Sequence, residues 1–423
     1  MNYMKKFLSP FYILVTIFPV IFFSGCIKDT CRQSRSYTMY VPVYKTNEEV
    51  RLNIKSNPAK EMERPGKLFI KGHYIFLNEV DKGIHVIDNS NPASPRNVSF
   101  IDIPGNVDLA VRGSILYADM YTDMVALDIA DPENISLKKV VEGVFPYRYY
   151  DSGFFMDSSK VIVDWVSRDT TITEDCGNGF GFWSNRETLA FSNDAGGAGS
   201  KGSSPFGMGG SMARFSVVQD RLYTVSYEDI TVFNIQNEID PLYASKVQVG
   251  WGIETIYPFK NNLFIGSTSG MFIYDISNAD QPKLTGKFGH VQSCDPVIAD
   301  DQYAYVTLRS GTECQGFTNQ LEVLKLNGIT DPALVKIYTL TNPHGLSKDG
   351  DLLFICDGSD GLKVFNAATP SNIYLIKHLT GLTTYDVIAW NQKAIVSASD
   401  GLYQYDYSNP NEIRLLSKLN YNR

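Results

Sequence analysis

The chain has 423 residues, with 38 Lys and Arg against 46 Asp and Glu and a formal net charge of −8. An acidic chain lacks the basic footprint that nucleic-acid binding requires, which argues against nucleic acid as a partner. Hydrophobic residues make up 43% and aromatic residues 13%, which excludes wholesale disorder and, together with 33 Gly and 19 Pro, favours strands and turns over helices.

Residues 1–25 have the pattern of a secretory signal peptide. Lys5 and Lys6 form a positive start, residues 7–23 are an apolar run, and Ser24-Gly25 directly precede Cys26. The apolar run is shorter than the roughly 20 residues that a membrane-spanning helix needs. The pattern resembles the bacterial lipoprotein signal, which implies a diacylglycerol on the Cys26 thiol and attachment to a membrane through that lipid. A plain signal peptide or an uncleaved anchor is the alternative.

Residues 26–65 are predicted to be the lipidated Cys and a polar tether. Lys28-Asp29 resembles a fragment of the surface-export signal of Bacteroidetes lipoproteins. The resemblance implies a place in the cell envelope, at the outer membrane, facing either the periplasm or the cell surface. Within the tether, Val50–Ile54 alternates between apolar and polar residues, which predicts a single strand.

One unit recurs roughly every 40 residues across residues 66–423. In each copy a short apolar strand ends in an anchor residue that is usually Asp or Asn, and a turn containing Pro follows. The seven anchors are Asp88, Asp128, Asn234, Asp275, Lys325, Asn366 and Asp406. The long interval between Asp128 and Asn234 leaves room for one more, degenerate unit near 161–173, so the sequence predicts about eight units.

Each unit has the same internal order of four short strands. Between residues 106 and 141 the apolar segments are Val107–Val111, Ile115–Asp119, Met124–Ile129 and Leu137–Val141, separated by turn residues. A four-stranded sheet with two apolar faces cannot bury both faces alone, whereas radial packing of such sheets buries them. The prediction is an all-β protein, a β-propeller of four-stranded antiparallel blades, with about eight blades and seven as the alternative.

The strands that end at the anchors also resemble a known repeat. His85-Val-Ile-Asp88, Val125-Ala-Leu-Asp128 and Phe272-Ile-Tyr-Asp275, each followed by an Asn/Asp-Pro turn or its variant, are similar to the LVIVD repeat of bacterial envelope propellers. Lys325 and Asn366 depart from the Asp of the motif. The resemblance implies the propeller fold and carries over no catalytic residues.

A second register lies about 20 residues before each anchor, at the expected start of the innermost strand of each blade. Because these strands line the central channel of a propeller, the register predicts carboxylates around one channel mouth, interrupted by an Arg and a His. Two interpretations stay open: the carboxylates tie turns and blades together, or they form a binding site or hold a cation. The candidate residues are Asp108, Asp151, Arg214, Glu254, Asp295, His344 and Asp386.

No metal site or cofactor is predicted from the remaining motifs. The cysteines form no CxxC pair, and Cys294 with Cys314 is the disulfide candidate, with buried free thiols as the alternative. The Gly- and Ser-rich insertion at 176–211 lacks the residue order of a phosphate-binding loop. Trp183, Trp251 and Trp390 are expected to pack between blades.

Three functions are compatible with these features. The favoured one is a non-enzymatic envelope module that binds a protein or glycan through one face of the propeller. The alternative is a glycan hydrolase or lyase that uses the channel-mouth carboxylates, for which no sequence motif provides independent support. A purely structural lipoprotein is the third.

Overall fold

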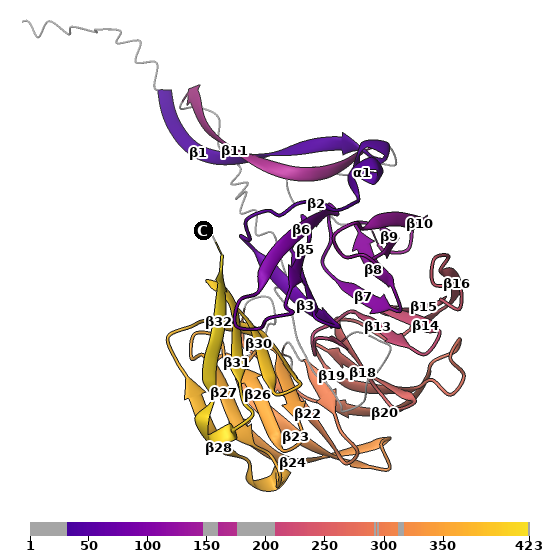
Figure 1. Cartoon of the computed structure of the whole chain (residues 1–423), viewed down its shortest axis with the longest axis vertical. Helices are drawn as coiled ribbons and strands as arrows, with labels where there is room; N and C mark the ends of the chain where they lie inside the picture. The colour runs from indigo at the N-terminus through magenta and orange to yellow at the C-terminus, as the bar shows by residue number, and fades with distance from the viewer. Residues whose placement is uncertain are drawn as a thin grey trace, which may run out of the picture. The chain divides into compact units, whose positions relative to one another are not determined.

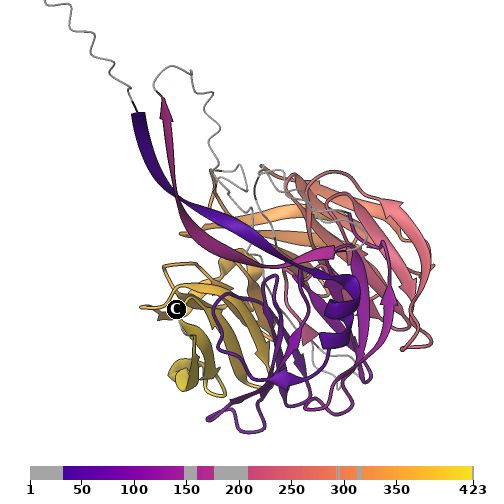
Figure 2. The ribbon, with the colours of Figure 1, turned by 90° about the horizontal axis from the view of Figure 1, so that it is seen from above.

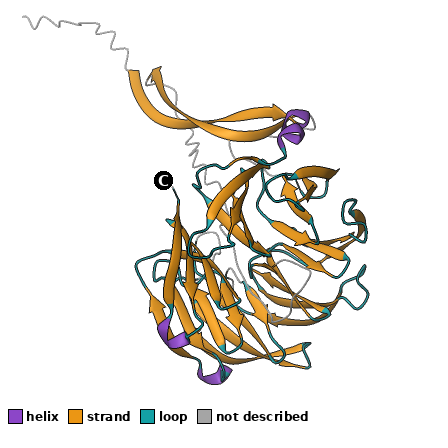
Figure 3. Cartoon of the chain, in the orientation of Figure 1, coloured by secondary structure: helices purple, strands orange, loops and turns teal. Residues whose placement is uncertain are grey.

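The computed structural model describes residues 32–146, 160–175, 208–291, 293, 296–311 and 317–421. Strands dominate, with one short helix, α1 (Asn47–Asn53), and two single 3-10 turns, Pro370–Asn372 and Pro410–Glu412 (Figure 3). In this described part of the chain, no helix is long and apolar enough to cross a membrane. The predicted all-β class is confirmed.

Seven blades of four antiparallel strands each form a propeller and are numbered in chain order (Figure 1); the sheet of blade 1 has two further short strands. Blades 1 and 2 are β3 (Pro65–Lys71), β4 (Tyr74–Glu79), β5 (Gly83–Asp88), β6 (Arg96–Asp102) and β7 (Leu109–Arg112), β8 (Ile115–Met120), β9 (Asp123–Asp128), β10 (Ser136–Val141). Blades 3 and 4 are β13 (Phe215–Val218), β14 (Arg221–Val225), β15 (Asp229–Asn234), β16 (Leu242–Gln248) and β17 (Ile253–Phe259), β18 (Asn262–Ser267), β19 (Gly270–Asp275), β20 (Lys283–Gly289).

The remaining three blades repeat the same order. They are β21 (Val297–Ala299), β22 (Tyr303–Leu308), β23 (Gln320–Asn327), β24 (Asp331–Thr339); β25 (Leu346–Asp349), β26 (Leu352–Cys356), β27 (Leu362–Asn366), β28 (Tyr374–Leu379); and β29 (Thr384–Trp390), β30 (Lys393–Ala398), β31 (Gly401–Asp406), β32 (Arg414–Asn420). The innermost strand comes first in every blade and the outermost strand comes last. The four strands predicted between residues 106 and 141 match blade 2 to within about two residues at each end.

The blade number is the predicted alternative of seven. Where the sequence predicted a degenerate unit near 161–173, the structure has β11 (Lys160–Asp175), which pairs with β1 (Arg32–Thr46) in a separate two-stranded sheet (Figure 2). Hydroxyl contacts join the two strands, with Ser36 Oγ and Thr171 Oγ1 2.8 Å apart. Alternation of apolar and polar residues is typical both of a twisted two-stranded ribbon and of a propeller blade. The sequence pattern therefore did not distinguish the ribbon from an eighth blade.

The anchor residues have a structural role at the end of the third strand. The Asp275 carboxylate accepts a hydrogen bond from the backbone N–H of Ser277 at 2.8 Å, and the Asn234 side chain accepts one from Gln236 at 2.9 Å. Such Asx turns reverse the chain toward the outer strand. In blade 5, where Lys325 stands at the anchor position, β23 continues and forms a hairpin with β24 through Gly328 and Ile329, both at positive φ.

Residues 46–58, which precede blade 1, pack against blades 1 and 2. Thr46 caps α1 in a capping box with Glu49, and Val50 and Ile54 are buried in the core shared with blades 1 and 2. The predicted strand at Val50–Ile54 is therefore wrong, because burial four residues apart suits a helix. Next, β2 (Asn57–Pro58) pairs with the outer strand β6, and β12 (Met208–Gly209) pairs with the inner strand β3, which gives blade 1 six strands.

The ring closes between blades 7 and 1 without exchange of a strand. The side-chain amides of Asn89 and Gln404 donate to each other, at 3.0 and 2.6 Å. Apolar residues of both blades, including Leu68 and Leu402, pack in one cluster. Figure 1 accordingly shows yellow β32 and β30 beside the indigo strands of blade 1.

Because the strands of a blade alternate in direction, the loops between given pairs of strands lie at the same face of the ring in every blade. One face carries the connections that enter the innermost strands and the turns between the second and third strands, such as Val249–Gly252 and Ser226–Glu228. We call it the entry face. The described residues of the predicted site lie at strand ends on this face: Asp108, Arg214, Glu254, His344 and Asp386.

Candidate functional site

Asp108 lies at the start of the innermost strand of blade 2 and is almost completely buried. Its Oδ2 atom accepts hydrogen bonds from Lys67 Nζ at 3.0 Å, from the backbone N–H of Phe215 at 3.2 Å and from that of Arg214. Its Oδ1 atom accepts from the backbone N–H of Leu109 at 2.7 Å. One carboxylate thus joins the innermost segments of blades 1, 2 and 3, and both of its oxygens are occupied.

Lys67 is a member of this cluster that the sequence analysis missed. It lies on β3 and is 5% exposed, with its charge paired to Asp108. It also precedes the anchor Asp88 by the same interval that relates the other candidates to their anchors. The spacing rule would have found it had the rule been applied to the first blade.

Asp386, on the innermost strand of blade 7, is fully buried. Its Oδ1 atom accepts a hydrogen bond from the backbone N–H of Val387 at 2.6 Å, whereas Oδ2 has no hydrogen-bond partner among the described residues. Burial raises the pKa of Asp386 to about 7; Asp108 adds to the rise and Lys67 opposes it. Asp108, Lys67 and Asp386 therefore form one electrostatically coupled group at the inner ends of blades 1, 2 and 7.

The other described candidates occupy separate positions around the channel. Arg214 Nε donates to the backbone oxygen of Glu254 at 3.3 Å, and both side chains are partly exposed. His344 is 5% exposed, and burial, together with the charge of Arg309, lowers its pKa to about 3. Its ring is therefore neutral, with Asn342 Nδ2 3.3 Å from Nε2.

Several predicted residues lie outside the described part of the chain. These are Asp151, Asp295, Cys26, Cys294 and Cys314, and the insertion is described only from residue 208 onward. Within the described ranges, Cys356 is a buried free thiol, and no group of three His, Cys, Asp or Glu side chains could hold a metal ion. The lipid site and the disulfide remain predictions.

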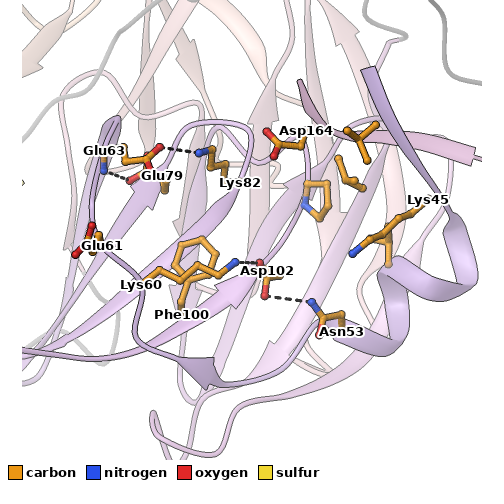
Figure 4. Close-up of a pocket in the computed structure, with 14 residues that line it drawn as sticks. Lys45, Asn53, Lys60, Glu61, Glu63, Glu79, Lys82, Phe100, Asp102 and Asp164 are labelled. Atoms are coloured by element: carbon orange, nitrogen blue, oxygen red, sulfur yellow. Dashed lines mark hydrogen bonds and ion pairs between the residues drawn. The ribbon is translucent and has the colours of Figure 1, made fainter. Parts of the chain in front are cut away.

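A pocket of about 420 Å³ opens beside blade 1 at the entry face (Figure 4). We call it the blade-1 pocket. Its apolar wall is formed by Val43, Val50, Phe100, Pro104 and Val163. Its polar lining consists of Lys45, Asn53, Lys60, Glu61, Glu63, Glu79, Lys82, Asp102 and Asp164.

Most of the charges in the blade-1 pocket are paired along its walls. Lys60 pairs with Asp102 while its Nζ lies 4.4 Å from the centre of the Phe100 ring, and Lys82 Nζ lies 2.8 Å from Glu63 Oε2. Glu79 is buried and accepts hydrogen bonds from the backbone N–H groups of Glu63 and Arg64.

The charges left in this pocket are mainly negative. Lys45, Glu61 and Asp164 form no ion pair with another described residue, so two carboxylates face one ammonium group. The sequence analysis missed this pocket because its lining comes from four distant segments, within 43–63, 79–82, 100–104 and 163–164.

Two tryptophans contradict their expected packing role. Trp251 is 74% exposed in the connection between blades 3 and 4, and Trp390 is 39% exposed at the end of β29, at the opposite face. Trp183 lies outside the described residues. The repeat pattern locates these residues near strand ends but does not determine which way a loop directs its side chain.

Comparisons with known proteins agree with the fold. The model of the LVIVD repeat matches residues 66–102, which correspond to blade 1. No curated protein sequence matches the chain. The computationally designed protein Ika8 is similar in structure, with a TM-score of 0.51 and 10% identity over 86% of this chain and 90% of that one.

Two natural proteins are more distant in structure. BamB from Moraxella catarrhalis has a TM-score of 0.45 and 12% identity, over 86% of this chain and 90% of that one. Sqt1 from Saccharomyces cerevisiae has a TM-score of 0.49 and 8% identity, over 87% and 90%. At these identities, structural likeness extends to the fold alone.

Proposed function

We propose that this protein is a non-enzymatic β-propeller module, lipid-anchored in the cell envelope, that binds a protein partner at its entry face. The observation that carries the proposal is the blade-1 pocket, which combines an apolar wall with two carboxylates, those of Glu61 and Asp164, that form no ion pair with another described residue. A Lys or Arg side chain of a partner would place its aliphatic stem on the apolar wall and its charge near one of the two carboxylates, Glu61 or Asp164.

The buried state of the central carboxylates disfavours the hydrolase alternative. A glycosidase needs two carboxyl groups that reach the substrate from either side of the scissile bond. Asp108 and Asp386 are 3% and 0% exposed, and both oxygens of Asp108 are already hydrogen-bonded within the protein. This geometry supports the structural interpretation of these two side chains.

Site-specific photocrosslinking of the full-length protein in the cells that make it tests the pocket. A photoreactive residue at position 45 should give a discrete protein adduct that the variant Glu61→Lys/Asp164→Lys loses, because a cationic partner group would be repelled. A photoreactive residue at position 390 and the exposed-site variant Glu412→Lys are the matched controls. The proposal fails if positions 45 and 390 give the same adducts, or if the charge reversal leaves the adduct unchanged.

The lipid anchor has its own test. Replacing Cys26 by Ser removes the thiol that would carry the diacylglycerol, so the variant should lose labelling by radioactive palmitate and leave the membrane fraction. Retention of the label by Cys26→Ser would contradict the proposed attachment site. Cys356→Ser is the control, because that thiol is buried.

A further inference from the structure

Trp251 and Tyr227 form an exposed aromatic pair on the entry face, which we call the aromatic ledge. Their ring centroids are 6.1 Å apart and their planes are nearly perpendicular, at 80°. Trp251 is 74% exposed and Tyr227 60% exposed. Large aromatic side chains are normally well buried in folded proteins, so two held together in solvent require an explanation.

The backbone holds the ledge in place from both sides. The N–H of Val249 donates to the Glu228 oxygen at 2.9 Å, and that of Ile253 donates to the Tyr227 oxygen at 2.9 Å. On the blade 4 side, the N–H of Thr268 donates to the Gly252 oxygen at 2.8 Å. The connection that carries Trp251 is thus fixed to turns of both neighbouring blades.

Glycines on either side of Trp251 make this conformation possible. Gly250 and Gly252 have φ values of 141° and 75°, which favour glycine. A Cβ atom at Gly252 would also lie 2.1 Å from Thr268 Oγ1. The two glycines and the backbone hydrogen bonds therefore fix the connection in a conformation in which the indole ring of Trp251 is exposed.

The residue types around the aromatic ledge favour some classes of ligand over others. The segments 226–229, 249–253 and 268–269 contain Ser, Thr, Gly and acidic residues, and no Lys, Arg or His. The Glu228 carboxylate forms no hydrogen bond or ion pair within the described part of the chain. Such surroundings offer hydrogen-bond acceptors and hydroxyls, and the positive charge of Lys246 is already paired with Asp229, with Lys246 Nζ 3.4 Å from Asp229 Oδ2.

We propose that the aromatic ledge binds a neutral glycan, with a sugar ring stacked on Trp251 and its hydroxyls donating to Glu228. The C–H face of a sugar is weakly positive and complements the negative face of an aromatic ring. A protein hot spot is instead surrounded by contacts that exclude water, whereas small polar residues border this pair. The ledge does not share residues with the blade-1 pocket, so either proposal can fail without the other.

Binding of the detergent-solubilised full-length chain to an array of neutral and acidic glycans tests this site. Calorimetry with the best neutral oligosaccharide then gives its affinity. We expect binding to neutral glycans, and a loss of about tenfold or more in affinity, about 1.4 kcal/mol, for Trp251→Ala. Trp390→Ala, an exposed Trp at the opposite face, should bind as the wild type does.

A second variant separates stacking from folding. Trp251→Phe keeps an aromatic face and should retain most of the affinity, while the shift in tryptophan emission on binding should disappear. The proposal is overturned if no neutral glycan binds, if only acidic glycans bind, or if Trp251→Ala binds as tightly as the wild type.

Discussion

Asp108 and Asp386 are two buried carboxylates in contrasting environments. Asp108 is paired with Lys67 and accepts backbone hydrogen bonds, whereas Asp386 has one oxygen without a hydrogen-bond partner in the described structure. Burial of a carboxylate disfavours its charged form unless nearby groups compensate. The pKa of Asp386 is about 7 because the hydrogen bond from Val387 and the charge of Lys67 offset only part of the cost of burying the charged carboxylate.

This pKa predicts a pH-dependent stability. Because the pKa of Asp386 in the folded protein lies above the ordinary value of 3.8, its stabilising contribution is complete below about pH 3.8 and disappears as the pH rises through 7. The variant Asp386→Asn lacks this titration. Urea unfolding should therefore show it gaining about 3 kcal/mol relative to the wild type between pH 5 and pH 8.

The control for this experiment is Asp351→Asn, because Asp351 is exposed in a turn of blade 6. It should leave the pH profile of the wild type unchanged. A constant difference between Asp386→Asn and the wild type across pH 5–8 would show that Asp386 does not titrate in this range.

Single residues also show how far the site could be read from the sequence. The spacing of about 20 residues before each anchor placed Asp108 and Asp386 at the inner strand starts, and Lys67 has the same spacing from Asp88. The spacing could not reveal the ion pair between Lys67 and Asp108. Repeat spacing shows which residues occupy equivalent positions in different blades, but it does not show which of their side chains are in contact. The anchors were identified from the sequence, whereas their Asx turns emerged from the structure.

At the scale of elements, α1 is the clearest difference between sequence and structure. The stretch Val50–Ile54 alternates in polarity, yet Thr46 and Glu49 form a capping box and only Val50 and Ile54 face the core. The spacing Thr-x-x-Glu was present in the sequence and favours a helix start. A short alternating segment does not distinguish strand from helix without such a signal.

The capping box predicts the effect of Thr46→Ala. Loss of the Thr46 hydroxyl removes the hydrogen bond from the Glu49 N–H, which should cost about 1 kcal/mol of local stability. Native-state hydrogen exchange should show faster exchange in α1 and unchanged protection in blades 4 to 6. Thr46→Ser, which keeps the hydroxyl, is the control. Equal exchange rates in α1 for the Ala variant and the wild type would contradict this role of the cap.

The outer strands share a feature that the sequence analysis did not detect. In all seven blades the pairing between the third and fourth strands shifts by one residue, near Leu284 in blade 4 and near Leu415 in blade 7. A bulge increases twist and makes an exposed edge less suitable for pairing with another chain. Lys246, Lys287 and Lys377 on three of these strands add a further barrier to such pairing.

At the scale of the whole molecule, the repeat count determined the architecture but not the number of blades. The interval between Asp128 and Asn234 is long enough for an additional unit, and in the structure its described part forms β10, β11, β12 and the first three strands of blade 3. Likewise, the blade-1 pocket combines segments separated by more than 100 residues. Neither feature follows from a local period.

Ring closure predicts the effect of Gln404→Leu. Gln404 is fully buried and exchanges two hydrogen bonds with Asn89, so a leucine would leave the Asn89 amide without these partners. The free energy of unfolding should fall by about 1–3 kcal/mol in urea titration. Gln281→Leu, at an exposed position, is the control. Closure does not depend on the amide pair if the two variants unfold at the same urea concentration.

The junction between blades 7 and 1 is made of side-chain contacts and contains no shared strand. Tyr421, after the last strand of blade 7, lies in the same apolar cluster as Leu68 on β3, the first strand of blade 1. The ring therefore has no obligatory starting point. A circularly permuted gene that links residue 421 to residue 65 and opens the chain between two other blades would encode the same interfaces between blades.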